Sequence, residues 1–232
     1  MSFWPTKDHW SVAIPTRTDH YLCPALEATG FVALTPYPGE IPAQEWEGLE
    51  YMDWKSGGDT NFAPLASADG ELDCRGFWDK GKTDKDALWT SNAAKAPTLQ
   101  RYVDSIGANF GRVRIIKLEP QDHEQALKSF HRDDNNRFNP AGEGWVVRTW
   151  VELTDSPDSY MLLMDLDDEG LPIASTERRV PLHQNARFVV DTQRLWHVVV
   201  HNGTSPRYAL ITSVESSPHL QDWIQSQVPA LV

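Results

Sequence analysis

Three residues in the C-terminal half have types and spacing that suit metal chemistry. His131 and Asp133 lie two positions apart, so in an extended segment both side chains point to the same side. Together with the more distant His197 they would form a face of two imidazoles and one carboxylate. Such a face holds Fe(II) and leaves positions open for a bidentate keto acid and oxygen. A closed zinc site would need another ligand and would leave no room for a substrate.

A basic residue that follows His197 extends this pattern. We expect residues 195–201 and 208–214 to pair as a hairpin, because the turn between them contains Asn-Gly and Pro. With His201 opposite Arg207, the side chains of His197, His201 and Arg207 share one face. Arg207 would then lie roughly 13 Å from His197, at about 3.3 Å per residue. A five-carbon keto acid could span that gap, chelating the metal at one end and binding the guanidinium at the other.

The surrounding segments predict a mainly β structure. Short strands are expected at 113–118, 146–153, 160–166, 188–191, 195–201 and 208–214, separated by turns rich in Asp, Asn, Gly and Pro. Many short strands at regular spacing favour an antiparallel barrel or jelly roll. In the first hundred residues prolines interrupt long elements, and we expect a strand at 30–34 and a helix at 97–105. The charged residues 80–85 are interpreted as a solvated loop.

The order of these motifs resembles that of the Fe(II)/2-oxoglutarate-dependent dioxygenases. Residues 113–215 are similar to the aspartyl/asparaginyl β-hydroxylase-like branch, which includes the free-proline hydroxylases. In this branch a strand such as 113–118 precedes the His-x-Asp pair, and a strand led by an arginine, here Arg148, follows it. A Trp-His run and an arginine ten residues after the histidine complete the pattern, here Trp196, His197 and Arg207. The resemblance does not extend to residues 1–112.

This resemblance implies a fold and a set of roles. The fold would be a double-stranded β-helix (jelly-roll, cupin-like) core with flanking helices, in a single domain over 1–232. Residues 1–112 would be a helix- and loop-rich part, 113–215 the core that carries the site, and 216–232 a C-terminal helix. His131, Asp133 and His197 would bind iron, and Arg207 would bind the distal carboxylate of 2-oxoglutarate. Arg148 would contact the cosubstrate or a substrate carboxylate.

The resemblance also implies a reaction. The enzyme would use O2 and 2-oxoglutarate to hydroxylate an unactivated C–H bond of a small amino-acid-like substrate, producing succinate and CO2. Asp133 favours hydroxylation, because halogenases of this superfamily have a small residue at that position. The chain departs from the family after the strand-leading arginine. There His-x-Pro-Leu is common, whereas this sequence has Trp150, Val151, Glu152 and Leu153.

Several features allow a second interpretation. Arg148 could pair with Glu152 on the same strand face, and His201 could hydrogen bond near Arg207 or contact the cosubstrate. Residues 134–143 could grip the substrate or form a solvated loop. Two other classes of protein also fit the pattern. One is a keto-acid-independent cupin-type metalloenzyme, and the other is a non-catalytic jelly-roll binding domain whose tryptophans form the recognition surface.

The composition limits the kinds of partner that this protein is expected to bind. The chain has 21 Lys and Arg against 33 Asp and Glu, a net charge of −12, which disfavours phosphate backbones and anionic membrane surfaces. We therefore expect a small-molecule substrate, no nucleic acid and no membrane, with a homodimer as one option. Cys23 and Cys74 are expected to be reduced thiols in a cytoplasmic protein. The first residues lack a basic and then apolar leader, so we expect no signal peptide.

Overall fold

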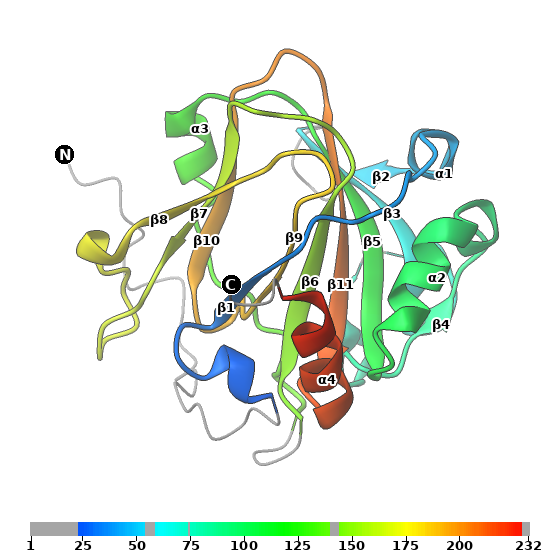
Figure 1. The fold of residues 1–232 in the computed structure, drawn as a ribbon, viewed down its shortest axis with the longest axis horizontal. Coiled ribbons are helices and arrows are strands. Elements are labelled where there is room, and N and C mark those ends of the chain that lie inside the picture. Colours follow the sequence, from blue (N-terminus) through cyan, green and yellow to red (C-terminus); the bar gives the residue numbers. More distant parts are fainter. Residues whose placement is uncertain (1–22, 54–58, 74, 140–143, 229–232) are drawn as a thin grey trace.

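The computed structural model describes residues 23–53, 59–73, 75–139 and 144–228, and within them two antiparallel sheets lie face to face (Figure 1). The larger sheet has the strand order β1-β9-β6-β11-β5-β3-β2, with β4 paired to β3. The smaller sheet has the order β10-β7-β8. The strands are β1 (Phe31–Leu34), β2 (Met52–Asp53), β3 (Thr60–Ser67), β4 (Leu88–Trp89), β5 (Phe110–Leu118), β6 (Val146–Glu152), β7 (Ser159–Met164), β8 (Arg178–Pro181), β9 (Arg187–Val190), β10 (Trp196–His201) and β11 (Arg207–Glu215).

Helices cover the outer faces of both sheets. The described α-helices are α1 (Gln44–Glu47), α2 (Pro97–Ser105), α3 (His123–Leu127) and α4 (Pro218–Gln227), and the 3-10 helices are η3 (Pro24–Leu26), η4 (Phe77–Lys80), η5 (Ala93–Lys95) and η6 (Ala174–Thr176). Helices α2 and α4 lie on the outer side of the larger sheet, and α3 lies beside β10 (Figure 1). None of these helices is long and apolar enough to cross a bilayer.

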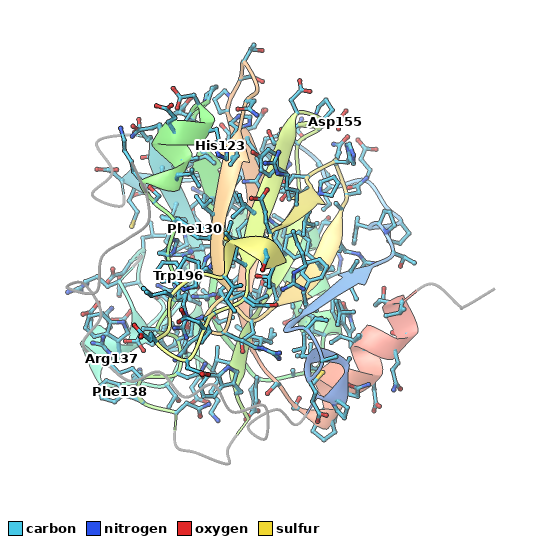
Figure 2. All side chains as sticks on the ribbon, turned by 90° about the vertical axis from the view of Figure 1, so that its left-hand side faces the viewer. His123, Phe130, Arg137, Phe138, Asp155 and Trp196 are labelled. Atoms are coloured by element: carbon cyan, nitrogen blue, oxygen red, sulfur yellow. The ribbon has the colours of Figure 1, made fainter. Side chains whose placement is uncertain are left out.

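Alternation along the strands builds three layers of core. On β11, Ala209 and Ile211 face the smaller sheet, whereas Leu210 and Val214 face the helices. This follows from the two-residue period of side chains in a strand. On the outer side of the smaller sheet, Phe130 packs against Trp196 with ring centroids 5.4 Å apart (Figure 2). Strands β6, β9 and β10 are therefore buried on both faces.

The helix predicted at 97–105 is confirmed as α2. Proline at its first turn needs no hydrogen-bond acceptor there, and Leu99, Tyr102 and Val103 form its buried stripe. The carboxylate of Glu45 accepts the backbone N–H of Thr98 at 2.7 Å, which caps the helix from outside. The C-terminal helix predicted within 216–232 is confirmed as α4, which begins after the capping hydroxyl of Ser217.

The predicted hairpin between residues 195–201 and 208–214 is wrong. Strand β10 pairs with β7, with His197 opposite Leu163, and β11 lies between β5 and β6, with Arg207 opposite Leu118. The turn after His201 therefore carries the chain from one sheet to the other. Because both strands are buried on two faces, each needs hydrogen-bonding neighbours within its own sheet. The predicted ranges of the six C-terminal strands agree with the structure within three residues at either end.

The thiol of Cys23, which we expected to be reduced, is free. It is fully buried and donates a hydrogen bond to Oε1 of Gln221 at 3.2 Å. Burial raises its pKa to about 11, so the reactive thiolate is scarce at neutral pH. Cys74 lies outside the described residues.

Candidate metal centre

An isolated antiparallel bridge brings the two predicted histidine ligands together. The backbone N–H of His131 donates to the carbonyl of His197 at 3.2 Å, and the N–H of His197 donates back at 2.9 Å. Directly opposed residues in such a bridge have close side chains, and the two imidazole centroids lie 4.4 Å apart. With Asp133 they form a group whose donor atoms all lie within 4.8 Å of one another. The structure therefore brings together all three residues predicted as metal ligands.

Hydrogen bonds fix the carboxylate of Asp133. The hydroxyl of Thr192 donates to Oδ2 at 2.7 Å, and Nε of Arg148 and Nδ2 of Asn135 approach the same oxygen at 3.4 Å. The other oxygen, Oδ1, lies 3.7 Å from Nε2 of His131. Oδ2 is thus used by protein donors, and Oδ1 faces the imidazoles as a donor atom for a cation.

Backbone carbonyls orient both imidazoles. Nδ1 of His131 lies 2.6 Å from the carbonyl oxygen of Ser129, and Nδ1 of His197 lies 3.4 Å from that of Leu195. A proton on Nδ1 of each ring satisfies these contacts and leaves Nε2 with a free lone pair. This is the usual arrangement behind metal-ligating histidines.

The electrostatics give two members of the triad, Asp133 and His197, the protonation states that a cation needs. Burial would raise the pKa of Asp133, but the charge of Arg148 and the nearby imidazoles hold it well below its usual range. Burial, and then the charge of His131, lowers the pKa of His197 to about 3. Burial also acts to lower the pKa of His131, yet its contact with Asp133 raises it overall. At neutral pH the carboxylate is ionised and His197 is neutral, as metal binding requires.

Arg148 contacts the triad through Oδ2 of Asp133. Its side chain is buried and also donates to the hydroxyl of Ser213 and the amide oxygen of Asn135. Its Nη1 lies 3.5 Å from Oδ2 of Asp84. The alternative pairing of Arg148 with Glu152 is not formed. The guanidinium borders the cavity, but its contacts hold the candidate ligand Asp133 in place.

Asp84 is a residue of this site that sequence reasoning missed. Residues 80–85 were expected to be a solvated loop, but Asp84 is 3 % exposed. Its Oδ1 accepts the backbone N–H of Arg112 at 2.7 Å, and its Oδ2 accepts the hydroxyl of Ser213 at 2.8 Å. A Cβ at Gly111 would lie 2.1 Å from the carbonyl oxygen of Asp84. That glycine is the one sequence signal of the close approach.

The loop after Asp133 is also packed against the rest of the protein. Asn136 is buried, and its side chain exchanges two hydrogen bonds with the backbone of Val146, at 2.7 and 3.0 Å. Arg137 lies over the ring of Trp78 at 4.1 Å and donates to Asp134 at 2.6 Å. The interpretation of 134–139 as a solvated loop is therefore wrong for Asn135 and Asn136. Residues 140–143 lie outside the described part of the chain.

Arg207 lies on the interior face of β11, next to Trp150, whose ring centre is 5.7 Å from the guanidinium carbon. It forms a fully buried ion pair with Glu152. Its Nε and Nη1 have no hydrogen-bond partner among the described residues. Buried donors without an acceptor are rare, so the donor set fits an anionic ligand. His201 is held by Ser159 at 2.8 Å and by the carbonyl of Ser205 at 2.8 Å.

A cavity of about 660 Å³ opens onto the triad. Its lining includes the two histidines and Asp133, apolar side chains of the sheet interior such as Leu118, Trp150, Val199 and Ile211, and the arginines Arg112, Arg114, Arg137 and Arg148. The guanidinium of Arg114 lies over the ring of Phe62 at 4.0 Å. Figure 2 shows Arg137 and the exposed Phe138 next to each other at the surface. This volume is in the usual range for small-molecule sites.

Comparison with known proteins identifies the fold. No protein-family model and no curated protein sequence matches this chain. A structure of an oxidoreductase of the 2OG-Fe(II) oxygenase family from Burkholderia pseudomallei superposes with a TM-score of 0.51 at 10% identity, over 87% of this chain and 90% of that chain. A prolyl hydroxylase from Trichoplax adhaerens, in complex with a hypoxia inducible factor peptide fragment, gives a TM-score of 0.49 at 13% identity, over 93% and 96%.

The fold is therefore the double-stranded β-helix of the 2-oxoglutarate/Fe(II) oxygenases, as predicted. Within it, the triad of His131, Asp133 and His197 could hold the metal.

Proposed function

We propose that this protein is an Fe(II)- and 2-oxoglutarate-dependent oxygenase that hydroxylates a C–H bond of a small amino-acid-like substrate. The observation that carries the proposal is the group of His131, Asp133 and His197, whose donor atoms lie within 4.8 Å of one another at the wall of a cavity. Three protein ligands of this kind suit Fe(II) and leave positions for exchangeable ligands. The iron, when bound, supplies the oxidising chemistry with O2 and the keto acid.

The chain's own residues would place the reactants. Nε2 of each histidine and Oδ1 of Asp133 would hold the cation, while Thr192 and Arg148 keep Asp133 in one orientation. Arg207 would bind the distal carboxylate of the keto acid. The apolar side chains at the inner end of the cavity would exclude water from the reacting centre.

Features of the cavity support an amino-acid-like substrate. Arg114 and Arg137 border it, each stacked on an aromatic ring, Phe62 and Trp78 respectively. A guanidinium at the edge of a cavity can bind the carboxylate of a ligand. Asp134, also at the cavity, pairs with Arg137 there, so the cavity presents both signs of charge to a zwitterionic ligand. A carboxylate and an ammonium together are the marks of an amino acid.

One observation favours a second candidate. The charge of Arg207 is already balanced by Glu152 inside the protein. A metalloenzyme that needs no keto acid would leave this ion pair as a structural feature, and it would use the same triad for Zn or Mn. The two candidates differ in whether a keto acid binds to the metal.

The test is an anaerobic titration followed by visible spectroscopy. The purified protein is loaded with Fe(II) and then given 2-oxoglutarate, and a charge-transfer band is expected when the keto acid chelates the iron. His197→Ala should lose the band. His183→Ala, which removes an exposed histidine, should keep it. Bound iron without a band would reject the dioxygenase in favour of the keto-acid-independent enzyme, and failure to bind Fe(II), Zn(II) or Mn(II) would reject both.

A further inference from the structure

The ion pair of Arg207 and Glu152 bears on how an anionic cosubstrate enters the site. Arg207 is at the start of β11 and Glu152 at the end of β6, and both side chains have no exposed surface. Trp150 Nε1 donates to the same Oε1 of Glu152 at 2.6 Å. The guanidinium of Arg207 is thus paired with the carboxylate of Glu152 even without a ligand.

The pair leaves polar atoms unused. Nε and Nη1 of Arg207 and Oε2 of Glu152 are buried without a hydrogen-bond partner among the described residues. Each such atom has lost its hydrogen bonds to water without gaining a partner, which destabilises the protein. A carboxylate ligand brings acceptors only, which suits Arg207 but leaves Oε2 of Glu152 without a donor. If Glu152 carries a proton, its O–H becomes a donor to that ligand.

Among the residues that the structure describes, Arg207 is the one cation paired with this carboxyl group. On β10, His201 faces Arg207, and its pKa is lowered, first by burial, so it is neutral at neutral pH. On the neighbouring strands Lys117 pairs with Glu119, and Arg187 binds Thr35 and Gln227 on the outer side of the sheet. A second carboxylate beside Arg207 would therefore place two anions on one buried guanidinium.

Placing two anions there is costly in a buried site. Two carboxylates that share one buried guanidinium repel each other, and the low-dielectric interior screens that repulsion only weakly. Burial already raises the pKa of Glu152, despite the attraction of Arg207. Protonation of Glu152 is the step that removes the second charge.

We propose that Glu152 is a specificity-determining residue of the cosubstrate site, so that the distal carboxylate of the keto acid binds Arg207 together with one proton that Glu152 takes up. The carboxylate of Glu152 gains a proton from solvent and becomes a neutral acid. Its O–H then donates to the incoming carboxylate, which replaces it as the counter-ion of Arg207. An O–H to carboxylate hydrogen bond of this kind is short and strong.

This inference rests on the proposed function, and a proton count tests it. The Fe(II)-loaded protein is titrated anaerobically with 2-oxoglutarate by calorimetry, between about pH 6 and pH 8.5, in pairs of buffers with different ionisation enthalpies. Bound iron keeps the triad in one protonation state. We expect uptake of about one proton per keto acid, so that Kd rises about tenfold for each pH unit.

Two variants sharpen the result. Glu152→Gln cannot take up the proton and should bind 2-oxoglutarate with a Kd that does not change with pH. At pH 8.5 its Kd should be at least tenfold lower than that of the wild type. Glu177→Gln removes a carboxylate that pairs with Arg179 at the surface and should keep the wild-type slope. If Glu152→Gln does not fold, the proton count on the wild type decides alone.

Failure of this inference and failure of the proposed function give different results. Binding without proton uptake, with a Kd independent of pH, would overturn the role of Glu152 and leave the proposed function intact. If iron-loaded wild type and Glu152→Gln both fail to bind 2-oxoglutarate at every pH, the proposed function itself is overturned, and this inference with it.

Discussion

Replacing Arg148 with glutamine should destabilise the metal-free protein strongly. The Arg148 and Asp84 side chains are 2 % and 3 % exposed, and Arg148 also contacts Asp133. The substitution removes the cation that the buried Asp84 shares with the partly exposed Asp133, and breaking a buried pair typically costs about 3–5 kcal/mol. Urea unfolding of the metal-free protein measures the loss, with an unchanged m-value as the check that the same transition is compared.

A double-mutant cycle isolates the electrostatic part of this effect. Asp84→Asn removes one of the carboxylates that Arg148→Gln would strand, so the double variant should lose less than the sum of the single losses. We expect a coupling of at least about 1 kcal/mol, because the groups are in contact. Arg179→Gln breaks an exposed pair with Glu177 and should stay within about 0.5 kcal/mol of the wild type. Strictly additive losses at Arg148 and Asp84 would refute the argument that one buried network links them.

Three other perturbations address the same site. Thr192→Val removes the 2.7 Å hydrogen bond to Oδ2 of Asp133 and should weaken Fe(II) or Ni(II) binding roughly 10-fold; an unchanged calorimetric Kd would contradict it. Gly111→Ala places a Cβ 2.1 Å from the carbonyl of Asp84 and should cost about 1–3 kcal/mol in urea unfolding, while a neutral result would deny the close approach. The pKa of Asp133 is depressed in the native state, so its stabilisation is present above about pH 4 and is lost as the pH falls through the native value. The stability difference between wild type and Asp133→Asn, both metal-free, should therefore shrink between pH 7 and pH 3, and a constant difference would count against it.

Local pattern was enough to predict the strands and the His-x-Asp pair, whereas the distant His197 was assigned from the family resemblance. A His-x-Asp pair needs only an extended backbone to align its side chains, and strand ranges follow from local hydrophobic runs and turn residues. The hairpin failed because the same local signals fit a turn that stays in one sheet and a turn that crosses to another. Whether the turn stays in one sheet or crosses to the other depends on whether β7 or β11 pairs better with β10. Packing across the whole core decides which strand pairs with β10.

The partners of the two arginines depended on more distant contacts. Glu152 is four positions from Arg148 on a strand where even spacing shares a face, so pairing between them was a reasonable interpretation. In the structure Glu152 pairs with Arg207 instead, and Asp84 pairs with Arg148. Asp84 is separated by more than sixty residues from Arg148, and only the folded sheet brings it there. Its charged neighbours made the segment resemble a surface loop.

The residues outside the resemblance are part of the site. Charges alternate in a row that runs from the buried interior to the cavity: Arg112, Asp84, Arg148 and Asp133 lie within 3.5 Å of their neighbours in that order. Asp84 and Arg112 belong to the first 112 residues, and Asp133 is the candidate metal ligand. A cation bound at the triad adds positive charge next to Asp133, and the second carboxylate of the row keeps Arg148 from facing that cation uncompensated. Residues 1–112 thus supply the negative charge of Asp84, which allows Arg148 to lie next to the candidate metal ligand Asp133.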